Sequence, residues 1–127
     1  MGINEVTLDF ISKFTRTWNE HDLDELMNFM ADECIFMASV GNEIDGEKWQ
    51  GQDQVRRGFA SLWEKYPDAH FESIGTDFVV GNRGVAEWIF SGTQASDGIK
   101  VVARGCDIFT FKNGKILIKN SMRKQKP

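Results

Sequence analysis

The sequence predicts an α+β fold, with three helices in its first half packed on one face of a curved, mostly antiparallel sheet. Two observations predict it. In the first half, Phe10, Phe14 and Trp18 recur every four positions, as on the buried face of a helix. The second half instead alternates apolar and polar residues between turn signals, of which Asn113-Gly114 is the strongest hairpin cue.

The first two helices are delimited by periodicity and by a capping signal. The apolar stripe predicts a first helix from about Ile3 to Asn19. A second helix is expected after His21, because Asp22 is a good N-cap and Glu25 stands three residues later, as in a capping box. We expect this helix to end near Ala31.

A strand, a loop and a third helix follow. Cys34 to Ala38 is typical of a short strand, and the loop after it predicts a small hairpin around Ile44 and Trp49. The third helix is expected from about Gln52 to Lys65, and Pro67 prevents it from continuing.

The rest of the chain is predicted to be strand. Gly-rich and Asn-Gly turns separate four segments and favour an antiparallel meander. The four segments are Phe71 to Val80, Val85 to Thr93, Ile99 to Phe111 and Ile116 to Arg123.

Composition fits one domain spanning the 127 residues. The net charge of −4 argues against nucleic acid as a partner. Cys34 and Cys106 form no CxxC pair and predict reduced core residues of a cytoplasmic protein. No leader-like or membrane-spanning apolar run occurs, and the basic run of Arg123, Lys124 and Lys126 is expected to be a solvated tail.

Four strings of the sequence resemble one known family. They are Trp18–Leu26, Met30–Cys34, Trp49–Val55 and Gly105–Ile116, and the resemblance extends over about Val6 to Met122. Together with the element order they are similar to the SnoaL-like branch of the nuclear transport factor 2-like superfamily, which includes polyketide cyclases and, more distantly, ketosteroid isomerase. The resemblance implies a cone-shaped α+β barrel with an internal pocket at its open end, and dimers formed through the outer face of the sheet.

The residues do not support ketosteroid isomerisation. Abstraction of a proton beside a carbonyl needs a carboxylate base and donors for the enolate oxygen. By the resemblance, the base position falls at Ala38 and the donor tyrosine at Phe14, and neither side chain can serve. Only the donor aspartate is matched, at Asp107.

Asp107 is therefore the candidate catalytic residue. In an alternating strand it shares the inward side with Phe109 and Phe111, where a desolvated carboxyl suits acid/base work. The resemblance agrees, because SnoaL-like cyclases use an aspartate at this strand position. The alternative is a structural carboxylate paired with a nearby Arg, Lys or Trp N–H.

Large rings and a few polar residues are expected to line the pocket. Arg123 belongs to an alternating polar set with Lys119 and Ser121, which the resemblance places inward. Simple hydrophobicity instead places Ile116, Ile118 and Met122 inward, and this conflict stays open. If the polar set points inward, Arg123 favours an anionic or carbonyl-bearing ligand. For the aromatic members the alternative is plain core packing. The predicted lining is Phe14, Trp18, Phe36, Ala38, Trp49, Phe59, Trp63, Trp88, Phe90, Phe109 and Arg123.

The remaining candidates favour structural roles. His21 and His70 lack the spacing of metal ligands, and no cofactor motif is present, so we expect neither a metal nor a cofactor. Glu87 is expected on the outer sheet face or in an interface.

The predicted function is a small-molecule pocket. The leading hypothesis is cofactor-free acid/base chemistry on an apolar ring or polyketide-like compound, such as aldol-type cyclisation, isomerisation or dehydration. The alternatives are a non-catalytic ligand-binding or accessory small-subunit domain, and a dimerisation module with a filled pocket. Apolar residues on both sides of the central strands predict a homodimer that buries the outer sheet face.

Overall fold

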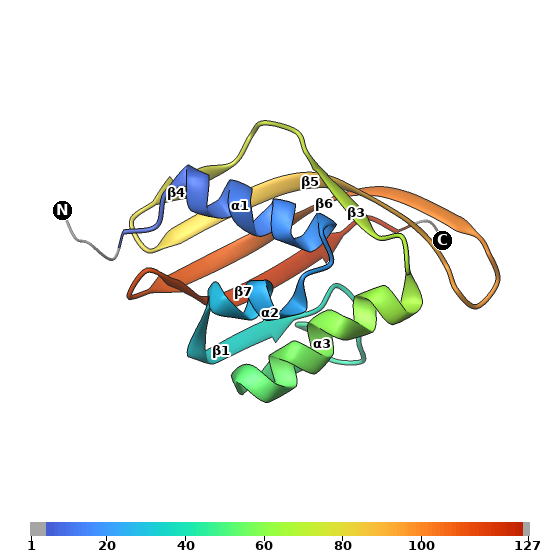
Figure 1. Ribbon diagram of the computed structural model, residues 1–127, viewed down its shortest axis with the longest axis horizontal. Helices are drawn as coiled ribbons and strands as arrows, with labels where there is room; N and C mark the ends of the chain where they lie inside the picture. Colours follow the sequence, from blue (N-terminus) through green and yellow to red (C-terminus); the bar gives the residue numbers. More distant parts are fainter. Residues whose placement is uncertain (1–4, 126–127) are drawn as a thin grey trace.

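The computed structural model describes residues 5–125 and has three helices on one face of a seven-stranded sheet (Figure 1). The predicted helix start at Ile3 and the tail residue Lys126 lie outside the described residues. The helices are α1 (Leu8–Asn19), α2 (Leu23–Asn28) and α3 (Gly51–Lys65). None of the helices in this part of the chain is long and apolar enough to cross a membrane.

The sheet is open, and only one pair of its strands is parallel. Its order is β2-β1-β7-β6-β5-β3, with β4 paired to β5 beside β3. The parallel pair is β1 with β7, and the other pairs are antiparallel, as predicted. The strands are β1 (Met30–Met37), β2 (Lys48–Gln50), β3 (His70–Ser73), β4 (Phe78–Val80), β5 (Arg83–Thr93), β6 (Lys100–Lys112) and β7 (Lys115–Arg123).

The first two helices are shorter than predicted. The first begins only at Leu8, because the Thr7 side chain caps it by accepting a hydrogen bond from the Phe10 N–H. Asp22 caps α2 as expected, by accepting from the Glu25 N–H. That helix does not reach Ala31, because the chain from Met30 onward pairs with β7. Tertiary pairing therefore overrides the helical pattern at this end.

Two strand predictions are also corrected. The segment from Phe71 to Val80 forms two short strands, β3 and β4, separated around Gly75 with a φ of +80°. A small hairpin does form after β1, and in it Trp49 pairs with Phe36. Ile44 takes no part in either strand and is fully exposed in the connecting loop.

Aromatic side chains fill the space between the helices and the sheet. Phe14, Phe59, Phe90 and Phe109 are fully buried there. Their rings meet mostly edge to face, for example Phe14 on Phe109 with centroids 5.9 Å apart. The side of the sheet that faces the helices is thus largely a packed core, which leaves limited room for a cavity.

A bulge in β7 decides which of its residues face the helices. Thr110 pairs with Ile118 and Phe111 with Ile116, so Leu117 is an extra residue on β7. The extra residue changes the phase of the alternation, and both Ile116 and Lys119 are buried while Met122 points outward. The polar set and part of the apolar set therefore share the inner face.

Candidate ligand-binding site

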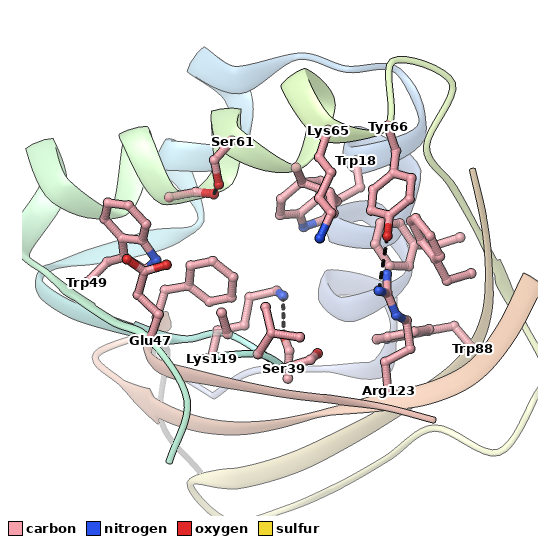
Figure 2. A pocket seen from close by; sticks show the side chains of 18 residues that line it. Trp18, Ser39, Glu47, Trp49, Ser61, Lys65, Tyr66, Trp88, Lys119 and Arg123 are labelled. Atoms are coloured by element: carbon pink, nitrogen blue, oxygen red, sulfur yellow. Dashed lines mark hydrogen bonds between the residues drawn. The ribbon is translucent and has the colours of Figure 1, made fainter. Parts of the chain in front are cut away.

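A cavity of about 140 Å³ opens between α3 and the inner face of the sheet (Figure 2). Apolar and aromatic side chains form most of its wall, and three cationic side chains and one carboxylate add charge. Its lining residues are Trp18, Phe36, Ala38, Ser39, Val40, Glu47, Trp49, Gly58, Ser61, Leu62, Lys65, Tyr66, Phe71, Trp88, Phe90, Lys119, Ser121 and Arg123.

One buried polar network adjoins the cavity, and three of its four residues, Trp88, Lys119 and Ser121, line it. The Lys119 ammonium donates to Asp107 Oδ1 at 3.0 Å and to Ser121 Oγ at 2.8 Å. Ser121 in turn donates to Asp107 Oδ1 at 2.5 Å, and Trp88 Nε1 donates to Asp107 Oδ2 at 3.1 Å. The Asp107 carboxylate thus accepts three hydrogen bonds and has an opposite charge beside it, which is how a buried carboxylate is stabilised.

The sheet register explains why these four residues meet. Asp107 on β6 lies directly opposite Ser121 on β7, and Lys119 is two residues from Ser121 on the same face. Trp88 on β5 lies opposite Gly105. A Cβ at Gly105 would stand 2.5 Å from the Trp88 ring, so glycine leaves the space that the indole occupies.

The Lys119 ammonium is also surrounded by rings. It lies 4.8 Å from the centroid of Phe36, 5.3 Å from Trp18 and 5.7 Å from Phe59. These three rings, which we call the aromatic cage, come from three different elements. Attraction of a cation to ring faces and the ion pair with Asp107 together hold a charge that burial alone would disfavour.

Arg123 forms a second cationic position on the same wall. Its guanidinium lies 4.6 Å from the Phe90 centroid and 5.4 Å from that of Tyr66, and it donates to the Tyr66 hydroxyl at 3.3 Å. In Figure 2, Lys119 and Arg123 both reach from the sheet into the space beneath α3, and Trp18 and Tyr66 face them.

Several N–H donors on the cavity wall have no acceptor in the described part of the chain. Arg123 Nε, Trp18 Nε1 and Trp49 Nε1 are buried and make no hydrogen bond there. A buried donor without a partner costs about 1–3 kcal/mol. These donors are buried behind the cavity surface, so the accessible positive charge of the wall comes from the Lys119 and Arg123 side chains.

Trp49 lines the cavity and packs on α3. Its ring lies so close to Gly58 that a Cβ there would stand 2.8 Å from the indole. Glycine in a helix interior costs about 1 kcal/mol relative to alanine. The close approach of Trp49 is the structural reason for a glycine at this position.

The structure brings most of the predicted lining to the cavity. The members that line it are Trp18, Phe36, Ala38, Trp49, Trp88, Phe90 and Arg123. Phe14 and Asp107 instead border a void of about 10 Å³ behind Lys119. Phe59 and Phe109 are fully buried in the core, and Trp63 packs against Trp18 without lining the cavity.

Sequence reasoning missed several lining residues. Lys65 and Tyr66 end the third helix, and only the helix end at Pro67 could have indicated that they lie near a cavity rim. Glu47 reaches the cavity because its carbonyl oxygen accepts a hydrogen bond from the Ala38 N–H at 2.9 Å, which closes the hairpin. That pairing has no signature in the sequence.

The other candidates have structural positions. His21 Nε2 lies 2.9 Å from the Ala69 carbonyl oxygen, and the ring stacks on Trp63. His70 is exposed at the start of β3. Glu87 lies on the outer face of β5 and is hydrogen-bonded to Thr76. Among residues 5–125, no group of three potential metal ligands occurs.

The two cysteines are free but differ in position. Cys34 is buried in the core, as predicted. Cys106 is half-buried on the outer face of β6, which corrects the expectation of a core residue, because its side chain alternates with that of Asp107. Burial raises the pKa of both thiols, so neither is activated as a nucleophile.

Known proteins share this architecture. A protein of unknown function with a cystatin-like fold, from Xanthomonas campestris, has a TM-score of 0.80 and 16% identity over 95% of this chain and 92% of its own. A provisionally assigned polyketide cyclase from Xanthomonas campestris pv. campestris has a TM-score of 0.75 and 16% identity over 91% of this chain and 88% of its own. A hypothetical protein with a ketosteroid isomerase-like fold from Catenulispora acidiphila was solved in complex with trimethylamine. It has a TM-score of 0.76 and 11% identity over 95% of this chain and 88% of its own.

These structural likenesses establish the fold, which is the one that the resemblance implied. No curated protein matches the sequence. The family model for the SnoaL-like domain, however, matches residues 11–118, which include all three helices except the first turn of α1. The chain therefore belongs to the SnoaL-like domain family.

Proposed function

We propose that this protein binds a small compound that has one apolar ring and a carboxylate or carbonyl group. The observation that carries the proposal is the combination of an aromatic wall with the Lys119 and Arg123 side chains. The ring of the ligand would pack on the aromatic residues, and its oxygens would accept hydrogen bonds from Lys119 and Arg123.

The size of the cavity limits the ligand. An engineered protein cavity of about 150 Å³ holds benzene. The cavity here has about 140 Å³, so its enclosed part fits a single ring with a small substituent. A fused polycyclic compound is too large for this enclosed part.

The position of Asp107 bears on the predicted acid/base role. Its carboxylate is held by Lys119, Ser121 and Trp88 and is not part of the cavity lining. We therefore propose that Asp107 acts through Lys119, whose ammonium would contact the ligand. Because both oxygens of the Asp107 carboxylate already accept hydrogen bonds within the protein, the arrangement also favours the second candidate function, binding without catalysis.

Ligand binding is expected to raise the melting temperature, because a small molecule that binds only the native state stabilises it. Benzoate and phenylacetate should raise it by more than sugars or nucleotides do. Loss of the charge in Arg123→Met should weaken benzoate binding about 10- to 100-fold, the effect of one hydrogen bond to a charged group. Thermal shift and calorimetric titration measure both effects.

The matched control is Arg104→Met, which removes a cation from the outward side of β6. It should leave benzoate binding unchanged. Equal weakening by Arg104→Met, or a larger thermal shift with phosphorylated metabolites than with benzoate, would contradict the proposed site.

The outer face of the sheet is proposed to bind a second copy of the chain. Val102 and Met122 are 57% and 48% exposed there, on the same side of the sheet as Glu87 and Arg104, which have opposite charges. A two-fold axis would place this face against the same face of the other copy. Val102 and Met122 would then supply the apolar contact, and Glu87 would lie near Arg104 of the other copy.

Light scattering at tens of micromolar should therefore give the mass of a dimer. Val102→Asp places a charge at the centre of the contact and should give a monomer, whereas Lys13→Asp on the helical side should not. A wild-type protein that is monomeric at this concentration would refute the dimer.

A further inference from the structure

The cavity contains a lysine in an unusual setting. The Lys119 side chain is only 5% exposed and lines the cavity, whereas Lys13, Lys48 and Lys112 are exposed and have surface carboxylates as partners. Its partner Asp107 is equally buried, with 8% exposure. An amine with an enclosed carboxylate beside it, at the wall of a ring-sized cavity, is an arrangement suited to carbonyl chemistry.

We propose that Lys119 Nζ forms a covalent imine with an aldehyde or ketone that enters the cavity. The inference rests on the proposed function, because it requires that a ring-sized compound with an acceptor oxygen binds there. It adds a reaction and narrows the ligand class to reactive carbonyl compounds.

The step balances without a cofactor. The Lys119 ammonium transfers a proton to the Asp107 carboxylate, and the freed nitrogen lone pair attacks the carbonyl carbon. A C–N bond forms, and the carbonyl oxygen takes up the proton held by Asp107. The nitrogen of this carbinolamine then gives one proton to Asp107, which passes it to the hydroxyl group. The C–O bond breaks, water leaves, and a protonated imine remains, which keeps the single positive charge beside Asp107.

The contacts around Lys119 favour each part of this step. Proton transfer runs along the hydrogen bond of 3.0 Å to Asp107, and Ser121 bridges the two groups. Both side chains are buried, so little water competes for the hydrogen bond between them. The aromatic cage shields the product from hydrolysis and attracts its positive charge.

Arg123 would orient the ligand. It lies on the same strand and the same inner wall as Lys119, with its Nε unpartnered. A compound with a carboxylate at one end and an aldehyde at the other could contact both residues. We therefore choose 4-formylbenzoate as the probe, with 4-methylbenzoate as a control of the same shape that has no carbonyl carbon to attack, and benzaldehyde as the uncharged aldehyde.

The experiment traps the imine with cyanoborohydride and locates it by peptide mass spectrometry. At low probe concentration, 4-formylbenzoate should label Lys119 at least tenfold faster than Lys13, which is exposed and lies outside the cavity. Excess 4-methylbenzoate should protect Lys119 but not Lys48. Lys119→Arg keeps the positive charge beside Asp107 but replaces the amine with a guanidinium, which does not form an imine, so labelling at position 119 should disappear while labelling of Lys13 stays unchanged.

Failure of this inference is separable from failure of the proposed function. If neither aldehyde labels Lys119 above the rate of the exposed lysines, the imine is refuted, whether or not 4-methylbenzoate binds. If benzaldehyde labels Lys119 but 4-methylbenzoate gives no thermal shift, the imine stands, and recognition of a carboxylate by Arg123 is refuted instead.

Discussion

Asp107→Asn is expected to destabilise the protein by about 3 kcal/mol or more, because it leaves the Lys119 ammonium buried without an opposite charge. The shape of the side chain hardly changes, and the amide oxygen can still accept from Trp88 Nε1. The loss therefore measures the removal of charge and not a cavity. Urea melts of both proteins at pH 8 give the difference in unfolding free energy.

The control is the double variant Asp107→Asn with Lys119→Met, which removes the unpaired cation as well. It should recover much of the stability, since apolar replacement of a buried pair is often neutral or better. An Asn variant as stable as the wild type would show that the carboxylate does not hold Lys119. The predicted role of Asp107 as an independent catalytic acid would then be favoured again.

Gly105→Ala is expected to cost about 2 kcal/mol or more, although alanine is normally preferred to glycine in a strand by about 0.5–1 kcal/mol. The new Cβ would stand 2.4 Å from the Met122 carbonyl oxygen and 2.5 Å from the Trp88 ring. Both must move, and Trp88 then withdraws its N–H from Asp107. Chemical denaturation and near-ultraviolet circular dichroism follow the stability and the indole environment.

A double-mutant cycle with Trp88→Phe isolates the clash. The smaller ring lacks the atoms that face Gly105, so Gly105→Ala should cost clearly less in the Trp88→Phe background. The same cost in both backgrounds would mean that the Met122 backbone, and not the indole, restricts position 105.

Much of the fold could be predicted from the sequence because periodicity and turn residues are local. The inward position of Asp107 follows from alternation along one strand, and Asn113-Gly114 gives the hairpin that brings β7 beside it. The end of α2 was wrong because pairing of Met30 with β7 is a long-range contact that competes with local helix preference.

The candidate site was less accessible to sequence reasoning. The question of whether Lys119 or its apolar neighbours face inward turned on one bulged residue, Leu117, and a bulge leaves no clear sequence signal. The pairing of Asp107 with a lysine or an indole was anticipated as an alternative, but the identity of both partners depends on register. Tyr66 and Glu47 reach the cavity through turns whose geometry the sequence does not encode locally.

The parallel pair of β1 with β7 has a kinetic consequence. The hairpins β5-β6 and β6-β7 join neighbours in the chain, whereas β1 must find β7 across most of the sequence. Loop-closure entropy makes such a non-local pairing slow. The cavity needs side chains from both partners, Phe36 on β1 and Lys119 on β7, so it exists only after this step. A ligand bound between them cannot speed the earlier stages of folding. Its stabilisation instead lowers the unfolding rate, and this lengthens the lifetime of the native state.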